Sequence, residues 1–141
     1  MSNITDNPRI LIVEDEKSIA NILKIILLKE GYCVTDIVAT GEEAIGIALD
    51  TRPDLILINI RLAGMLDGIT TYEQIKKTVE IPVIFVSGYT DNRIIARSMQ
   101  CKPIGYIVKP FKSAQIINEV QKALVSKNLY LNCEIIHASI S

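Results

Sequence analysis

Tryptophan is absent from this 141-residue sequence, histidine occurs once, and aromatic residues make up only 5%. There is no dense run of lysine and arginine, and the 15 basic and 16 acidic residues leave a net charge of -1. Proteins that bind nucleic acid directly usually present a basic patch, often with aromatic side chains that stack on bases. We therefore expect no direct contact with nucleic acid.

Long hydrophobic runs are missing as well. No segment reaches the ~18 consecutive apolar residues that a membrane-spanning helix needs. The first residues, Met1 to Pro8, are polar and lack the basic stretch and apolar run of a targeting segment. We expect no contact with a membrane and a cytoplasmic location.

Cysteine and histidine provide little material for a metal cluster. Cys33, Cys101 and Cys133 are widely spaced and form no CxxC pair, and the single histidine, His137, lies near the end of the sequence. This pattern favours three separate core or surface cysteines over a disulfide or a zinc site. A Ser/His/Asp triad and a histidine phosphocarrier are equally poorly supported.

Short apolar runs alternate with longer segments of helical period, which is typical of βαβ units around a parallel sheet. The hydrophobic fraction of 49% and the length suit one globular domain. The predicted strands are Arg9–Val13, Cys33–Val38, Leu55–Ile58, Val83–Val86 and Ile104–Val108. The predicted helices are Ser18–Lys29, Gly41–Asp50 with Thr40 as its N-cap, Gly68–Val79, Asp91–Gln100 and Ser113–Ser126.

This order of elements predicts an α/β fold. Right-handed crossovers wind the strands into a flavodoxin-like three-layer α/β/α sandwich, with a five-stranded parallel sheet in the order 2-1-3-4-5. We assign residues 1–8 to an N-terminal extension, 9–126 to the domain and 127–141 to a C-terminal tail. The tail has apolar residues without a clear period, so an additional helix, a partner contact and the start of a longer protein remain open for it.

Polar side chains follow four of the predicted strands. Glu14 and Asp15 follow the first, Asn59 the third, Ser87 the fourth and Lys109 the fifth. Ligands of open α/β sheets bind at the carboxyl ends of the strands. Two adjacent carboxylates suit Mg²⁺, whereas a hydroxyl and an ammonium group suit a phosphoryl group. An acidic pair that begins a helix is more often a partner of the helix dipole, but the joint placement indicates a magnesium-assisted phosphoryl site.

Four segments resemble the receiver domains of two-component response regulators. They are VEDE at Val13–Glu16, PDLILINIRLAGMLDG at Pro53–Gly68, VIFVSGY at Val83–Tyr89 and GYIVKPF at Gly105–Phe111. The resemblance covers roughly Arg9 to Val125. It implies a non-enzymatic module of phosphorelay signal transduction, with a sensor histidine kinase or a phosphotransfer protein upstream and an output protein downstream. It also implies a partner or homodimer surface on the fourth helix, fifth strand and fifth helix.

The resemblance assigns roles to individual residues. Glu14, Asp15, the side chain at Asn59 and the backbone carbonyl of Arg61 are the metal ligands. Ser87 is the switch hydroxyl, Lys109 pairs with the phosphoryl group, and the bond between Lys109 and Pro110 is cis. Tyr106 matches the aromatic switch residue, although a half-buried tyrosine on an edge strand explains it equally well.

The loop before the third helix departs from the pattern of the family. Ala63 stands where proline is common, and Leu66 makes the loop one residue longer than usual. We interpret Asp67 as a turn residue rather than as a replacement acceptor of the phosphoryl group.

Asn59 changes what the site can do. In the family an aspartate at this position attacks phosphorus, whereas an amide oxygen is a poor nucleophile. The resemblance therefore implies that the chain is not phosphorylatable, and the loss of one negative charge weakens Mg²⁺ binding. Asn59 can still accept a hydrogen bond, for example from Lys109. A natural receiver that signals without phosphorylation and an engineered Asp→Asn substitution both remain open.

Two other functions compete with this interpretation. The first is a phosphorylation-independent protein-interaction domain, and the second is a flavin-binding electron carrier with the same fold. A flavin phosphate needs backbone amides and hydroxyls after the first strand, but Glu14, Asp15 and Glu16 would repel it. The sequence therefore favours the interaction domain as the alternative.

Overall fold

The computed structural model describes residues 7–88 and 92–140, with side chains described as far as residue 126. The strands are β1 (Arg9–Val13), β2 (Cys33–Val38), β3 (Leu55–Asn59), β4 (Val83–Ser87) and β5 (Gly105–Val108). The helices are α1 (Lys17–Lys29), α2 (Gly41–Thr51), α3 (Gly68–Lys76), α4 (Asn92–Gln100) and α5 (Ser113–Ile140).

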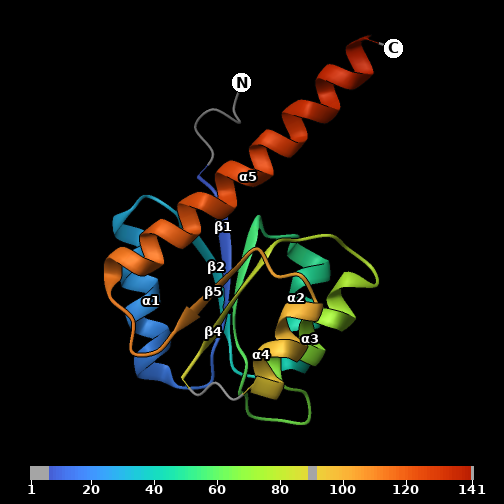
Figure 1. Ribbon diagram of the computed structural model, residues 1–141. Coiled ribbons are helices and arrows are strands. Elements are labelled where there is room, and N and C mark those ends of the chain that lie inside the picture. Colours follow the sequence, from blue (N-terminus) through green and yellow to red (C-terminus); the bar gives the residue numbers. More distant parts are fainter. Residues whose placement is uncertain (1–6, 89–91, 141) are drawn as a thin grey trace.

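All strand pairs are parallel, and the sheet has the order β2-β1-β3-β4-β5. Helices cover both of its faces, with α1 and α5 on one face and α2, α3 and α4 on the other (Figure 1). This arrangement confirms the predicted fold class, the strand order and the three layers. The reversal of strand order lies between β1 and β3, the strands that begin the two halves of the sheet.

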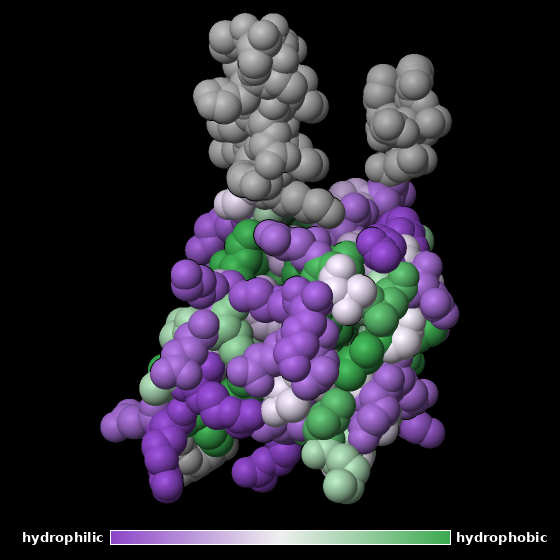
Figure 2. Space-filling model, turned by 90° about the vertical axis from the view of Figure 1, so that its right-hand side faces the viewer, coloured by the Kyte–Doolittle hydropathy of each residue, from purple (hydrophilic) through white to green (hydrophobic). Residues whose placement is uncertain are grey.

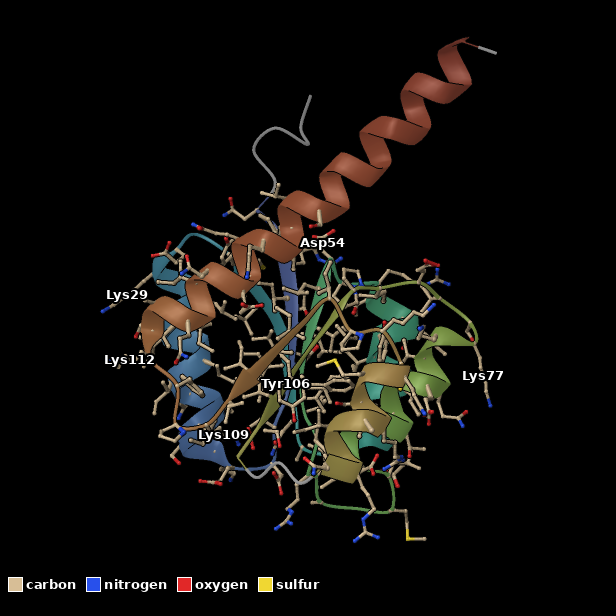
Figure 3. All side chains as sticks on the ribbon, in the orientation of Figure 1. Lys29, Asp54, Lys77, Tyr106, Lys109 and Lys112 are labelled. Carbon is tan, nitrogen blue, oxygen red and sulfur yellow. The ribbon has the colours of Figure 1, made fainter. Side chains whose placement is uncertain are left out.

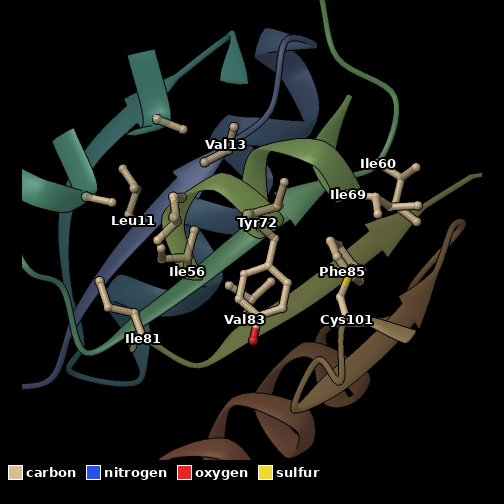
Figure 4. Packing of buried hydrophobic residues seen from close by; sticks show 14 of the residues in the cluster. Leu11, Val13, Ile56, Ile60, Ile69, Tyr72, Ile81, Val83, Phe85 and Cys101 are labelled. Atoms are coloured by element: carbon tan, nitrogen blue, oxygen red, sulfur yellow. The ribbon is translucent and has the colours of Figure 1, made fainter. Parts of the chain in front are cut away.

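The sheet has a hydrophobic core on each face. Side chains alternate across a strand, so Ile10 and Ile12 of β1 contact the α1 and α5 side, whereas Leu11 and Val13 face α2 and α3. Figure 4 shows the core on the α2 and α3 side, in which Tyr72 of α3 lies over Phe85 of β4 with ring centroids 5.8 Å apart. The strands at the centre are buried on both sides, which explains their nearly continuous apolar runs.

Local signals set the ends of the first two helices. Gly31 follows α1 with a φ of +88°, a left-handed conformation that favours glycine, and its N–H donates to the carbonyl of Leu28. Thr40 caps α2, because its Oγ1 accepts a hydrogen bond from the backbone N–H of Glu43 at 3.2 Å. The Thr40 cap agrees with the sequence prediction.

Three helices end at other residues than predicted, and α2 differs by a single residue, since it ends at Thr51 rather than Asp50. α5 continues to Ile140 rather than ending at Ser126, since residues 127–140 contain no glycine or proline to stop it. Figure 1 shows this continuation extending away from the sheet. α3 ends at Lys76 rather than at Val79, and the N–H groups of Thr78 and Val79 both donate to the carbonyl of Ile75 in a closing turn.

The other expectations concern cysteine, histidine and the membrane. Cys33 and Cys101 are free thiols, one exposed and one buried. The side chains of Cys133 and His137 lie outside the described residues. Among the helices that the structure describes, none has the length and hydrophobicity to span a membrane. Figure 2 shows a mainly hydrophilic surface over the α2, α3 and α4 side, interrupted by a band of hydrophobic residues.

Gly68 generates the first testable prediction. A β-carbon there would overlap the backbone oxygen of Asn59 and lie 2.9 Å from Cα of Ile60, whereas a β-carbon at Gly46, in the middle of α2, would meet open space. We expect Gly68→Ala to lower the free energy of unfolding by roughly 1–3 kcal/mol. Gly46→Ala, the matched control, should raise it by about 0.5–1 kcal/mol. Urea unfolding measures both, and equal stability of the two variants would contradict the close approach at Gly68.

Candidate functional site

The polar residues that follow the strands meet at one edge of the sheet. A pocket of about 550 Å³ lies there, and Asp15, Asn59, Ser87 and Lys109 line it from the ends of four strands. Figure 3 shows Lys109 at the edge where the strands end, opposite Asp54. The structure thus brings together the side chains that the sequence places at this edge.

Glu14 is the buried centre of this site. Glu14 is only 3% exposed, although its side chain is a carboxylate. Oε1 accepts a hydrogen bond from Nζ of Lys109 at 3.0 Å, while Oε2 accepts one from Nδ2 of Asn59 at 3.1 Å and one from the N–H of Glu16 at 3.1 Å. A buried charge without such partners would strongly destabilise the fold. The contacts therefore fix Lys109 and Asn59 against Glu14.

Asn59 makes a second short contact. The same Nδ2 donates to the backbone carbonyl of Arg61 at 2.6 Å. The opposite orientation of the amide would place its oxygen against two acceptors, so the nitrogen belongs on this side. Lys109 donates to the charged Glu14 rather than to Asn59, the acceptor that we had suggested, because a carboxylate is the stronger acceptor.

The other predicted residues have different environments. Asp15 is exposed, whereas the neighbouring Glu14 is buried, so the two adjacent carboxylates lie in different environments. Ser87 is 4% exposed and lines the pocket, and its carbonyl accepts a hydrogen bond from the N–H of Lys109. The bond between Lys109 and Pro110 is cis, the isomer that the resemblance implies. Tyr106 lies against Phe85, with ring centroids 6.4 Å apart.

Arg97 was missed by the sequence analysis. It extends from α4, and its Nη1 contacts Oδ2 of Asp67 at 2.8 Å while Nη2 donates to Oγ1 of Thr70 at 2.8 Å. We call these three residues the α4 clasp. Asp67 also caps α3, since its Oδ1 accepts a hydrogen bond from the N–H of Thr70 at 2.7 Å. The sequence signals the cap, but the reach of Arg97 depends on where α4 packs.

The clasp shifts the ionisation of both charged members. Burial alone would raise the pKa of Asp67, but hydrogen bonds from Arg97 and Thr70, together with the positive charge of Arg97, lower this pKa below its ordinary value of 3.8. The hydrogen bond to Asp67 raises the pKa of Arg97. Both side chains are therefore charged at neutral pH, and the clasp closes one wall of the pocket.

The sequence model of the response regulator receiver domain matches residues 10–121. The chain belongs to the response regulator receiver family. It is a receiver domain of two-component signalling. The DNA-binding response regulator MtrA of Mycolicibacterium smegmatis is 30% identical over 120 residues, which cover 85% of this chain and 52% of that protein. The receiver therefore spans about half the length of this relative.

Solved structures resemble the receiver along most of its length. The signal receiver domain of a modulated diguanylate cyclase from Desulfovibrio desulfuricans has a TM-score of 0.83 and 35% identity, and covers 89% of this chain and 99% of its own. A CheY-like receiver domain protein from Methanospirillum hungatei has a TM-score of 0.81 and 26% identity, with the same coverage of 89% and 99%.

Receiver domains typically bind Mg²⁺ at this acidic pocket. The arrangement in this receiver does not fit the ion, because Nδ2 of Asn59, a donor, occupies lone pairs of both Glu14 and the Arg61 carbonyl. Within the described part of the chain, no three His, Cys, Asp or Glu side chains are grouped to hold a metal ion. A cation would compete with the Asn59 amide for the same oxygens.

The α4 clasp leads to a prediction about pH. Asp67→Asn keeps a capping side chain but removes the charge, and the pair is 45% and 36% exposed, so the free energy of unfolding should fall by well under ~1 kcal/mol at neutral pH. The folded-state pKa of Asp67 lies below its unfolded value. Its charge therefore stabilises the fold above the unfolded pKa, and this contribution disappears as the pH falls through the folded pKa.

Urea unfolding of both proteins between about pH 6 and pH 3 tests this expectation, and the difference between them should shrink toward the acid end. Asp67→Ala is the control, because it also loses the helix cap and should cost about 1 kcal/mol more at every pH. A difference between wild type and Asp67→Asn that grows on acidification would show that the clasp does not lower the pKa of Asp67.

Proposed function

We propose that this receiver is a signalling module that acts without phosphorylation. The observation that carries the proposal is Asn59, whose position matches the phosphoacceptor of the family and whose amide nitrogen is hydrogen-bonded to Glu14 and Arg61. An amide oxygen lacks the negative charge and nucleophilicity that attack on phosphorus requires. The chain therefore forms no acyl phosphate, and its neutral amide lowers the affinity for Mg²⁺.

In this proposal the remaining site residues have the same roles as the residues at the matching positions of the family. Glu14, Asp15 and the Arg61 carbonyl surround the metal position, and Ser87 and Lys109 face the phosphoryl position. The shared pocket supports this assignment, since Asp15, Arg61, Ser87 and Lys109 all line it. Tyr106 corresponds to the aromatic switch residue, and its place on β5 next to Phe85 supports that role.

Response regulators interact with histidine kinases and output domains. We propose a sensor histidine kinase or a phosphotransfer protein as the upstream partner and an output protein as the downstream partner, all in the cytoplasm. The contact surface lies on α4, β5 and α5, and it also suits a homodimer. Large hydrophobic residues that this surface exposes on α4, on β5 and directly before β5 support the assignment; they are Ile95, Met99, Val108 and Ile104.

Receiver domains are generally non-enzymatic signalling modules, and we extend this description to the present chain. We also propose that it makes no direct contact with nucleic acid. The DNA binding in the name of MtrA belongs to the whole of that protein, of which the match covers 52%. An interaction domain in which the pocket serves only to stabilise the fold is the second candidate, favoured by the complete engagement of Glu14.

Intact-mass spectrometry after incubation with acetyl phosphate and Mg²⁺ tests the proposed function. We expect no mass increase for the wild-type receiver, because Asn59 cannot form the acyl phosphate. Asn59→Asp restores a carboxylate beside Lys109 and Ser87, and should gain the mass of one phosphoryl group.

Asp67 provides the matched control, because it is the other carboxylate between β3 and α3 that lines the pocket. Asn59→Asp combined with Asp67→Asn should still gain one phosphoryl group. An increase in the mass of the wild-type protein would refute the proposal. If that increase were absent in the single variant Asp67→Asn, Asp67 would be the acceptor instead.

A further inference from the structure

The side-chain amide of Asn59 links Glu14, which follows β1, to the backbone of the loop between β3 and α3. The residue is 7% exposed, and its Nδ2 lies 3.1 Å from Oε2 of Glu14 and 2.6 Å from the carbonyl oxygen of Arg61. A primary amide carries two N–H bonds, so one nitrogen atom can satisfy both acceptors. Glu14 directly follows β1 and Arg61 lies in the loop between β3 and α3, so the contact ties this loop to the sheet.

The charge of Glu14, the carboxylate that contacts this amide, is already paired with Lys109. Lys109 lies 3.0 Å from Oε1 of Glu14, which leaves the Asn59 nitrogen and the N–H of Glu16 to serve Oε2. A carboxylate oxygen and a carbonyl oxygen are also the groups that a divalent cation would use as ligands. A cation that used these two oxygens as ligands would compete with the Asn59 nitrogen for both of them.

We propose that the Asn59 amide nitrogen takes the place of the divalent cation in this receiver. It links Glu14 to the Arg61 carbonyl and keeps the site assembled in the absence of both a metal ion and a phosphoryl group. This inference rests on the proposed function, because it explains how a receiver that is not phosphorylated keeps its acidic site in order.

The link extends from Asn59 to α4. The loop that contains Arg61 ends at Asp67, and the N–H of Gly68 donates to the carbonyl of Ile60 at 2.7 Å. Asp67 in turn holds Arg97 of α4 through the α4 clasp. Both ends of the loop are therefore anchored, one by the amide link and one by the clasp. The α4 side of the proposed partner surface then keeps one arrangement whether or not Mg²⁺ is present.

Thermal unfolding in EDTA and in MgCl₂ tests the inference on the intact chain. The melting temperature of the wild-type receiver should differ by less than about 1 °C between the two conditions, since its site gains nothing from the ion. Asn59→Asp places a second carboxylate beside the buried Glu14, so it should melt lower in EDTA and recover by about 3–10 °C in ~10 mM MgCl₂. Asn59→Ala should melt lower in both conditions, because neither acceptor regains a donor.

Asp15→Asn is the matched control, because Asp15 is an exposed carboxylate that lines the same pocket. It should reduce the MgCl₂ response of Asn59→Asp and leave the insensitivity of the wild type unchanged. A wild-type melting temperature that rises in MgCl₂ as much as that of Asn59→Asp would overturn the inference. If Asn59→Asp does not fold in EDTA, the response of the wild type alone decides.

The failure of this inference is distinguishable from failure of the proposed function. A wild-type protein that gains phosphoryl mass refutes the phosphorylation-independent function, whatever its melting temperature does. A wild-type protein that gains no mass but is stabilised by MgCl₂ retains the proposed function and refutes the amide link. A side-chain NH₂ signal of Asn59 that is unchanged by MgCl₂ in ¹⁵N NMR spectra supports the link independently of stability.

Discussion

A carboxylate buried beneath the end of a parallel sheet needs hydrogen-bond donors, and Glu14 obtains them from three places. Lys109 directly follows β5, Asn59 is the last residue of β3, and the N–H of Glu16 lies in the turn after β1. Each donor is positioned by a strand or a loop whose place in the sheet is fixed by the two hydrophobic cores. The polar site and the apolar core therefore depend on each other, because a shift of β5 or β3 would leave the charge of Glu14 without a partner.

Much of this arrangement follows from the sequence, for identifiable reasons. The bounds of β1 and β2 were predicted as observed, since buried strands appear as compact apolar runs between turn residues. Glu14, Asn59, Ser87 and Lys109 were predicted at one edge because parallel strands end on the same side of a sheet. The resemblance to receiver domains then assigned a role to each residue at that edge.

Other features could not be predicted, because they depend on tertiary packing. The sequence places Glu14 and Asp15 side by side, but only the backbone path after β1 buries one and exposes the other. Which atom of the Asn59 amide faces Glu14 is decided by the neighbouring Arg61 carbonyl, whose position belongs to the loop. Arg97 lies far from Asp67 in the sequence, and the placement of α4 alone brings them together. The end of α5 was missed because apolar periodicity stops before the helix does.

Tyr106 has two opposing preferences. Its ring packs against Phe85 at the edge of the second core, yet its hydroxyl oxygen is buried and, among the described residues, finds no hydrogen-bond partner. Burial of the ring favours the inward position, whereas hydration of the hydroxyl favours an outward one. These terms are of similar size, so the stabilisation gained by burying the Tyr106 ring is largely offset by the cost of its unpaired hydroxyl.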